Sequence, residues 1–231
     1  EKTGAPIITT IMGKGAVSSK HPLYLGNIGI HGSYAANHAV SECDVLFSIG
    51  TRFNDRITGK ISEFAPNATI VHIDIDSASI SKNIVVDVPI VADAKLAIEA
   101  LLEQMEPLSI DGWVKEVKEW KEQYPINMNK YDGLTPEKVI RYINENYEHP
   151  IITTDVGQNQ LWATQYFDIE SNRQFLTSGG LGTMGYGFPA AIGAKLGNPD
   201  ADVIAISGDG GMQMNIQEMA TAVALELPLT L

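Results

Sequence analysis

The sequence predicts an α/β protein made of two doubly wound domains, each built on a parallel sheet. Short apolar runs that end in glycine or carboxylate residues recur along the chain, at residues 45–50, 70–76 and 203–210. Helix-like stretches alternate with these runs in both halves, a pattern that favours parallel sheets covered on both faces. A length of 231 residues is sufficient for two domains of moderate size.

Composition excludes several classes of protein. The formal charge is −12 with only 16 Lys and Arg residues, which argues against binding to nucleic acid or to an anionic membrane surface. No apolar run approaches the length of a membrane span, and no signal-peptide pattern is visible at the start. The single cysteine, Cys43, excludes an internal disulfide and a thiolate metal cluster. We therefore expect a soluble, cytoplasmic protein.

The first half begins with an apolar strand at residues 6–11 and continues with a buried strand at 45–50. Arg52 and Arg56 follow that strand, and two forked guanidinium donors suit a diphosphate or another anion. Alternatively, these arginines pair with Asp55 or Glu63 on a solvated loop. The strand at 70–76 ends in carboxylates, which suit the hydroxyl groups of a ribose.

The middle of the chain predicts a connection between two domains. An amphipathic helix spans 95–104, and residues 107–133 form a linker that includes a helix at 111–123. Trp113, Val117 and Trp120 make an apolar stripe on this helix, which predicts a packing face. Thr135 as an N-cap with Pro136 at the first helical position marks a new domain. The predicted domains are thus 1–106 and 134–231.

Three strand-to-loop transitions follow in the second half. Residues 151–163 form a strand, a polar loop and a helix start; the glycine-rich loop 178–187 precedes a small-residue helix opened by Pro189. The strand at 203–207 leads into Gly208-Asp209-Gly210. Such transitions predict one pocket at one sheet edge, where Asp209 would bind Mg²⁺ that bridges to a diphosphate. An ordinary Asp-Gly turn is the alternative interpretation of Asp209.

These segments resemble a known family. Three motifs are similar to those of the diphosphate-binding domain of thiamine diphosphate enzymes: residues 154–158, 178–185 and 208–210. Their sequences are most similar to those of acetolactate synthase (acetohydroxyacid synthase) large catalytic subunits. Residues 26–32, 50–59 and 72–76 resemble the FAD-carrying middle domain of the same family. The resemblance implies thiamine diphosphate, Mg²⁺ and FAD as cofactors. It also implies that 1–106 is the FAD domain and 134–231 a thiamine diphosphate domain truncated at its C-terminus.

For the thiamine diphosphate site, the resemblance implies two residues that act in catalysis. Gly182 would contact the aminopyrimidine, and Met184 would be the apolar wedge that bends the cofactor; plain core packing is the alternative for Met184. The remaining cofactor contacts implied in this domain are Val156, Gly157, Gln158, Asn159, Gly208, Asp209, Gly210, Gly211 and Met214, with Asp209 as the metal ligand. The family usually has histidine at the position of Asn159, which cannot shuttle a proton at neutral pH.

For the flavin site, the resemblance implies contacts along the whole first half. They are Thr10, Ile11, Met12, Ile28, Gly29, Ile30, His31, Gly50, Thr51, Arg52, Asn54, Arg56, Ile57, Asp74, Ile75, Asp93 and Ala94. Asn54 departs from the family, which usually has aspartate there. In acetolactate synthases the flavin is chiefly structural, in accordance with a reaction that is not an overall redox change.

The implied function is condensation of two 2-oxoacids, pyruvate with pyruvate or 2-oxobutyrate, with loss of CO₂ in branched-chain amino acid biosynthesis. The alternatives are an FAD-dependent pyruvate oxidase, another thiamine diphosphate 2-oxoacid decarboxylase, or a nucleotide-binding fragment without catalysis. The family also implies a homodimer or tetramer with a possible small regulatory subunit. The 231 residues resemble a middle portion of a longer enzyme, without its activating glutamate and one metal-binding asparagine. We therefore expect the isolated chain to be inactive.

Overall fold

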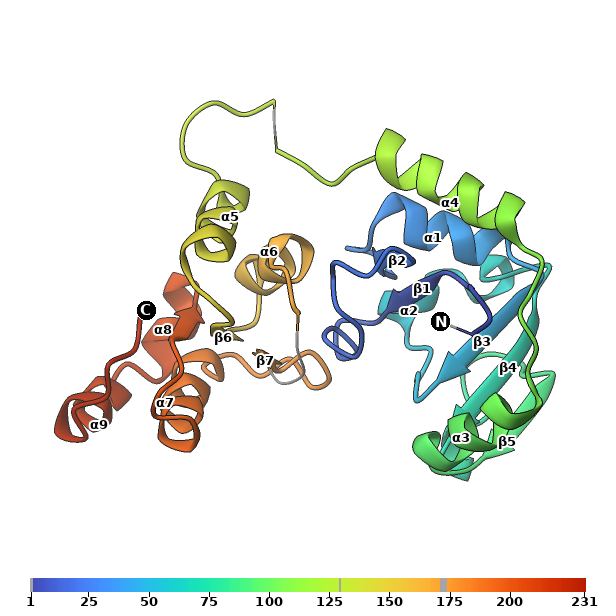
Figure 1. Ribbon diagram of the computed structural model, residues 1–231. Helices are drawn as coiled ribbons and strands as arrows, with labels where there is room; N and C mark the ends of the chain where they lie inside the picture. The colour runs from blue at the N-terminus through green and yellow to red at the C-terminus, as the bar shows by residue number, and fades with distance from the viewer. Residues whose placement is uncertain (1, 129, 171–173) are drawn as a thin grey trace. The chain divides into compact units, whose positions relative to one another are not determined.

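The computed structural model describes residues 2–128, 130–170 and 174–231, which form two compact units (Figure 1). The first unit contains the residues up to Thr10 together with Leu25–Pro125, and the second contains Ile11–Tyr24 and Ile126–Leu231. None of the described helices is both long and apolar enough to cross a membrane. Each unit contains its own parallel sheet, so the α/β class predicted from the sequence is confirmed.

The elements up to residue 123 are β1 (Ile7–Thr9), β2 (Tyr24–Asn27), α1 (Tyr34–Glu42), β3 (Val45–Ile49), α2 (Asp55–Thr58), the 3₁₀ turns η1 (Ile61–Glu63) and η2 (Ser77–Ser79), β4 (Thr69–Asp74), β5 (Val88–Val91), α3 (Ala94–Gln104) and α4 (Asp111–Gln123). The later elements are α5 (Pro136–Asn146), β6 (Ile151–Thr154), α6 (Gln158–Tyr166), β7 (Phe175–Thr177), α7 (Gly187–Gly197), β8 (Val203–Ile206), α8 (Asp209–Met214) and α9 (Glu218–Ala224).

The sheet of the first unit has the order β3-β4-β5, and β1 pairs separately with β2. All three strands run parallel, with Asp74 opposite Val91. Beyond the strand ends, Gly50 N–H donates to Ile73 O (2.8 Å) and Ala92 N–H donates to Asp74 O (3.1 Å). The loops that leave these three strands therefore start side by side at one edge of the sheet.

The prediction of a buried strand at 45–50 is correct for the strand and wrong for its burial. Val45, Phe47 and Ile49 are 53%, 43% and 38% exposed, and only Ser48 is buried. β3 is an edge strand, and its alternate side chains share a face that the described residues leave partly open. The opposite face packs on a core that includes Phe53, Ile70 and Ile84. An unbroken apolar run thus does not by itself establish burial on both faces.

Helix α4 packs along α1 in the first unit, as Figure 1 shows. Its Val117 is 1% exposed and joins a core with Leu25 and Ala36, and Trp113 and Trp120 pack against this core. The apolar stripe is therefore a packing face, as its spacing predicts. The domain limits at 106 and 134 remain predictions, although this helix belongs to the first compact unit.

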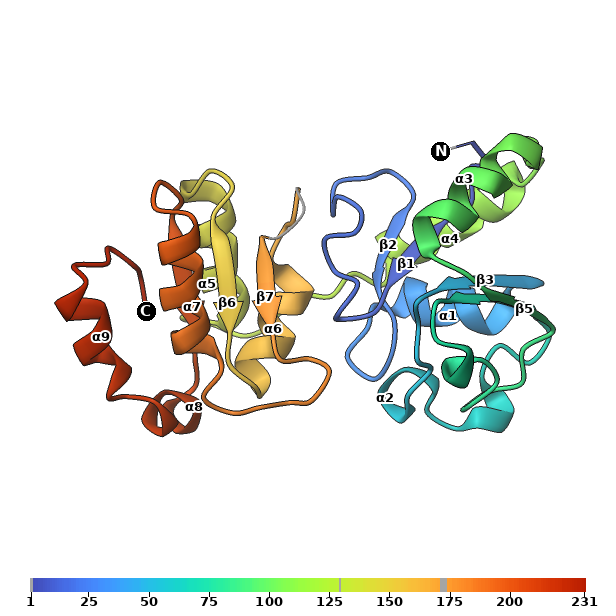
Figure 2. The same ribbon diagram turned by 90° about the horizontal axis from the view of Figure 1, so that it is seen from below.

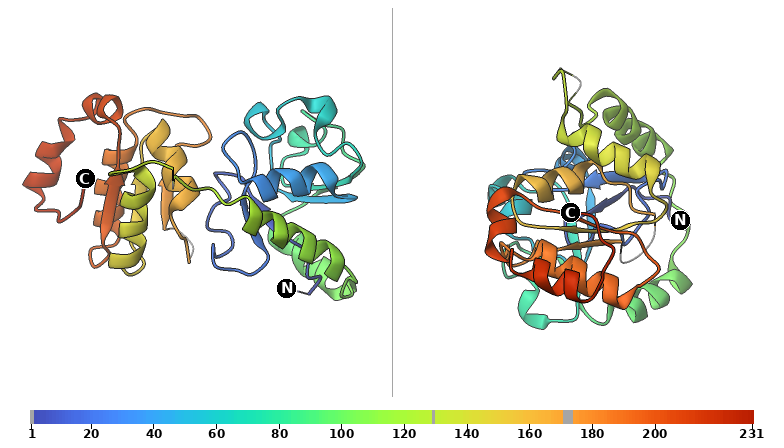
Figure 3. Two further views of the ribbon diagram at one scale, coloured as in Figure 1. Left: turned by 90° about the horizontal axis from the view of Figure 1, so that it is seen from above. Right: turned by 90° about the vertical axis from the view of Figure 1, so that its left-hand side faces the viewer.

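The sheet of the second unit has the order β7-β6-β8, and all its strands are parallel; Figure 2 shows β6 and β7 as arrows in one direction. From β6 the chain passes to β7 on one side and then to β8 on the other. Ile152 and Ile204 pack with α5 and α6, whereas Ile151 and Val203 pack with α7 on the opposite face (Figure 3, right). This is the reversal of strand order that defines a doubly wound sheet.

The capping and proline signals in the sequence predict the start of α5 correctly and the start of α7 incorrectly. Thr135 accepts a hydrogen bond at Oγ1 from Lys138 N–H (3.3 Å) and Pro136 opens α5, as predicted. Helix α7 begins at Gly187, however, and not at Pro189. Its first residue, Gly187, lies against the end of β6, where a Cβ atom would stand 2.6 Å from Asp155 N.

Candidate cofactor site

Three loops of the second unit leave the sheet at one edge. Asp155 N–H donates to Ile206 O (2.9 Å), which joins the ends of β6 and β8. The hydroxyl groups of Thr154 and Thr177 lie 2.7 Å apart and join β6 to β7. The polar loops that begin at residues 155, 178 and 207 are therefore neighbours at the carboxyl edge, where open α/β sheets bind their ligands.

Asn159 lies between two of these loops. Cβ atoms added to Gly157 and Gly208 would stand 3.5 and 3.4 Å from Asn159 Nδ2, so both backbones pass close to the amide. Gly157 also has a φ of +132°, which favours glycine. In the part of the chain that the structure describes, Asn159 Oδ1 is buried without a hydrogen-bond partner. An unused buried acceptor is costly, so Oδ1 favours a bound group that offers a hydrogen-bond donor, whereas Nδ2 of the same amide can donate to an anion.

Asp209 lies three residues after the end of β8 and opens α8. Its side chain is exposed and forms no ion pair with any described residue. The described residues contain no group of three His, Cys, Asp or Glu side chains that could hold a metal ion. A magnesium ion at Asp209 would therefore take its other ligands from backbone oxygens, amides, water or a diphosphate.

Two exposed methionines lie beside this edge. Met184 and Met214 are 45% and 55% exposed, which argues against plain core packing for Met184. A Cβ atom on Gly210 would stand 3.5 Å from Met184 Cε, and one on Gly185 would stand 3.0 Å from Met214 Cβ. The structure thus brings Met184 next to the Gly-Asp-Gly segment. Gly182 has a φ of +77° and open space on its Cβ side, which allows a flat group to approach its backbone.

The remaining predicted residues of this unit lie on the same loops or in the helices that follow them. Val156 precedes the α6 start at Gln158, and Gly211 is in the first turn of α8. Asp155 was not among the predicted site residues, yet it is 1% exposed, begins the loop after β6 and contacts the other two segments at Gly185, Gly187 and Gly211. Only its position inside a Thr-Asp-Val-Gly segment could have indicated it.

At the edge of the first unit's sheet, two arginines are available for an anion. Arg52 and Arg56 are exposed, and neither forms an ion pair within 4 Å of a described carboxylate. Glu63, the alternative partner, pairs with Lys60 instead. Gly50 has a φ of +63° and open space on its Cβ side. These features suit a phosphate better than an internally paired loop.

The loop after β2 is fastened to α2. Ile30 N–H donates to Arg56 O (2.9 Å), and a Cβ on Gly29 would stand 2.4 Å from the same oxygen, which only glycine permits. Ile28 N–H donates to Thr9 O (2.9 Å), at the end of β1. The end of β1, the loop after β2 and helix α2 are therefore adjacent. The loops after β2 and β3 also carry His31, Thr51 and Asn54, while Ile57 lies in α2 and Ala94 opens α3.

Some predicted flavin residues have other contacts. Ile11 and Met12 belong to the second unit, where a Cβ on Gly179 would stand 3.1 Å from Ile11 Cγ2 and 2.9 Å from Met12 Sδ. Asp93 caps α3, since its Oδ1 accepts the N–H groups of Lys95 and Leu96 (2.9 and 3.1 Å).

The predicted adenosine contacts at the end of β4 also have contacts within the chain. Asp74 Oδ1 accepts Asp76 N–H (2.8 Å), while Ile75 is 73% exposed. One oxygen of Asp74 thus already stabilises the local turn, and the other, Oδ2, lies 3.7 Å from His72 Nε2. Thr10, whose carbonyl accepts from Asn27 Nδ2 (3.0 Å), stays with the first unit.

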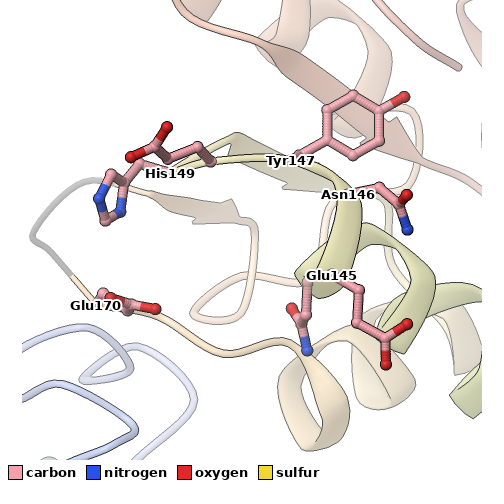
Figure 4. Close-up of a pocket in the computed structure, with 7 residues that line it drawn as sticks. Glu145, Asn146, Tyr147, His149 and Glu170 are labelled. Carbon is pink, nitrogen blue, oxygen red and sulfur yellow. The ribbon is translucent and has the colours of Figure 1, made fainter.

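A polar pocket elsewhere in the second unit is not this site. Glu145, Tyr147, His149 and Glu170 are among the residues that line it, at the end of α5 and before β6 (Figure 4). It therefore lies near the amino end of β6, whereas ligands of open parallel sheets bind beyond the carboxyl ends. The acidic lining also disfavours a diphosphate.

Both halves of the chain match models of one enzyme family. Residues 1–101 match the central domain of thiamine pyrophosphate enzymes, and residues 155–231 match their C-terminal TPP binding domain. The chain belongs to the thiamine pyrophosphate enzyme family. The loops at the edge of β7-β6-β8 thus lie in the domain that binds thiamine diphosphate in this family.

Curated relatives have a more specific name. The chain is 47% identical to the "Probable acetolactate synthase large subunit" of Methanococcus aeolicus, over 100% of the chain and 42% of that protein. It is 49% identical to the protein of the same name from Methanocaldococcus jannaschii, over 98% of the chain and 40% of the relative. It is 46% identical to acetolactate synthase 1, chloroplastic, of Nicotiana tabacum, over 99% and 36%. The chain therefore spans about two fifths of the length of these relatives.

Proposed function

We propose that the full-length protein containing these residues is an acetolactate synthase. It would join two molecules of pyruvate, or pyruvate and 2-oxobutyrate, with loss of CO₂. The observation that carries the proposal is the meeting of three loops at one sheet edge, in a chain 47% identical to an acetolactate synthase large subunit over its whole length.

The residues at that edge fit thiamine diphosphate and Mg²⁺. The Nδ2 group of Asn159, which lies beside Gly157 and Gly208, would donate to the diphosphate, and the exposed carboxylate of Asp209 would bind the metal ion. Met184 would support the bent shape of the cofactor from its position beside the Gly-Asp-Gly segment. When bound, thiamine diphosphate supplies a nucleophilic carbon and an electron sink for decarboxylation of a 2-oxoacid.

We further propose FAD at the edge of β3-β4-β5. Arg52 and Arg56 would bind its diphosphate, and Asp74 and Asp93 would accept hydrogen bonds near its adenosine end. The open face around Gly50 gives this group room. A homodimer or tetramer with a small regulatory subunit completes the proposal, in line with the large-subunit names of the relatives.

Product analysis tests the function directly. The full-length protein is given ¹³C-pyruvate with Mg²⁺, thiamine diphosphate and FAD, and products are followed by NMR while oxygen uptake is recorded. Acetolactate without oxygen uptake supports the proposal. Acetate or acetyl phosphate with oxygen consumed would show a flavin oxidase, and acetaldehyde alone a simple decarboxylase. Cofactor binding without any turnover would leave a nucleotide-binding protein.

A further inference from the structure

Asp155 is a buried carboxylate at the end of β6. It is 1% exposed, and no described cation lies within ion-pair distance of it. Three backbone donors surround it instead: Val156 N–H (2.8 Å) and Gly185 N–H (3.0 Å) donate to Oδ1, and Gly187 N–H (3.0 Å) donates to Oδ2. A carboxylate is costly to bury, so its donors must be held firmly in place.

Glycines make this arrangement possible. A Cβ atom on Gly187 would stand 2.6 Å from Asp155 N, and one on Gly211 would stand 2.4 Å from Asp155 Oδ1. Side chains at these positions would displace backbone or the carboxylate itself. Asp155 therefore touches three segments at once: the end of β6, the glycine-rich loop that leads into α7, and helix α8.

The same contacts control the peptide next to Met184. Asp155 holds the N–H of Gly185, and Asn215 Nδ2 donates to the carbonyl of Gly185 (2.7 Å). Gly185, which follows Met184, is thus hydrogen-bonded through both its N–H and its carbonyl group. Gly211, against the carboxylate, follows Asp209 and Gly210 directly in α8. One buried group therefore contacts both the segment that carries Met184 and the segment that carries Asp209.

We propose that Asp155 is a positioning residue, which aligns Met184 and Asp209 for cofactor binding without touching the cofactor. The inference rests on the proposed function of these two residues. It predicts that disturbing Asp155 misplaces both groups together, since both attach to its three bonded segments. A misplacement of about 1 Å at such a site is sufficient to reduce catalysis by about 100-fold.

The test uses Asp155→Asn in the full-length protein. The amide keeps the shape but directs an NH₂ group at a backbone N–H, so one hydrogen bond is lost. We expect an at least tenfold lower affinity for thiamine diphosphate with Mg²⁺, measured by calorimetry, and an at least tenfold lower kcat at saturating cofactor. We also expect faster hydrogen exchange in a peptide covering residues 185–187 of the cofactor-free protein.

Thr153→Val is the matched control. Thr153 is 0% exposed and its Oγ1 donates to Gly187 O (2.8 Å), so the variant loses a buried hydrogen bond between the same two segments. It keeps all donors of Asp155. We expect a lower melting temperature with cofactor affinity and kcat within twofold of the wild type. A general loss of stability would instead affect both variants equally.

Three results separate the outcomes. If Asp155→Asn lowers only the melting temperature and binds cofactor like the wild type, the inference is wrong. If the wild type binds thiamine diphosphate but forms no acetolactate, the proposed function fails, while the affinity measurement still decides the role of Asp155. If Asp155→Asn does not fold, Gly187→Ala, at a position outside the predicted cofactor contacts, presses a methyl group on the backbone of Asp155 instead. The same tenfold loss of affinity is then expected, and an unchanged affinity overturns the inference.

Discussion

Replacing Asp209 with asparagine separates metal binding from folding. The wild-type carboxylate is exposed and has no ion pair with a described residue, so its loss should change the free energy of unfolding by no more than about 0.5 kcal/mol without cofactor. With thiamine diphosphate and Mg²⁺ at 100 times the dissociation constant, binding adds about 2.7 kcal/mol of stability to the wild type. A roughly 100-fold weaker affinity would reduce that gain to about 0.4 kcal/mol.

Urea unfolding of the full-length protein, with and without both ligands, measures these differences. Asp202→Asn is the matched control, because Asp202 is also exposed and lies just before the amino end of the same strand. It should keep the full ligand-induced gain. If Asp209→Asn keeps the full gain as well, Asp209 does not bind the metal ion and is an ordinary Asp-Gly turn.

Three further predictions concern the fold and are read by urea unfolding. Ser33→Ala should lower the free energy of unfolding by about 1–2 kcal/mol, because the hydroxyl both caps α1 and donates to Leu25 O in β2. A decrease below about 0.3 kcal/mol would contradict this. Gly185→Ala should cost about 2–4 kcal/mol, since its Cβ would stand 2.7 Å from Asn215 Nδ2 at a φ of +86°. Gly133→Ala should lower the free energy of unfolding by only about 1 kcal/mol, because Gly133 has a φ of +85° but open space around its Cβ position. Equal decreases for the two alanine variants would show that the contact with Asn215 does not destabilise Gly185→Ala. Burial lowers the pKa of His72 below its usual 6.5, so the unfolded chain binds more protons and His72 reduces stability as the pH falls below 6.5. His72→Phe should remove this dependence, and parallel profiles from pH 7 to 5 would contradict it.

Local features of the chain were readable from sequence because they depend on near neighbours. The N-cap at Thr135 and the apolar stripe on α4 follow from spacings of three or four residues, and both match the structure. Short apolar runs that end in glycine likewise mark the strands correctly. Each rule involves contacts within one helical turn or one strand, which the order of residues alone specifies.

Burial of β3 and the contacts of Ile11 and Met12 were not readable in this way. The apolar run at Val45–Ile49 is the same whether the strand lies in the centre of a sheet or at its edge. Ile11 and Met12 continue β1 in sequence, yet they lie against Gly179, more than 160 residues away. Which surface covers a residue depends on the packing of distant segments, and no local pattern records it.

For the candidate site, the sequence by itself determined the chemistry of the parts: glycine-rich loops after three strands, one carboxylate in Gly-Asp-Gly, and a methionine among glycines. Their positions along the chain identify the family, because each motif is contiguous. Only the tertiary structure decided that Asp155 joins these loops, since its donors Gly185 and Gly187 are 30 and 32 residues away. A buried carboxylate is satisfied through space by whichever backbone the fold brings to it, so its role exists only once the strands and loops are assembled.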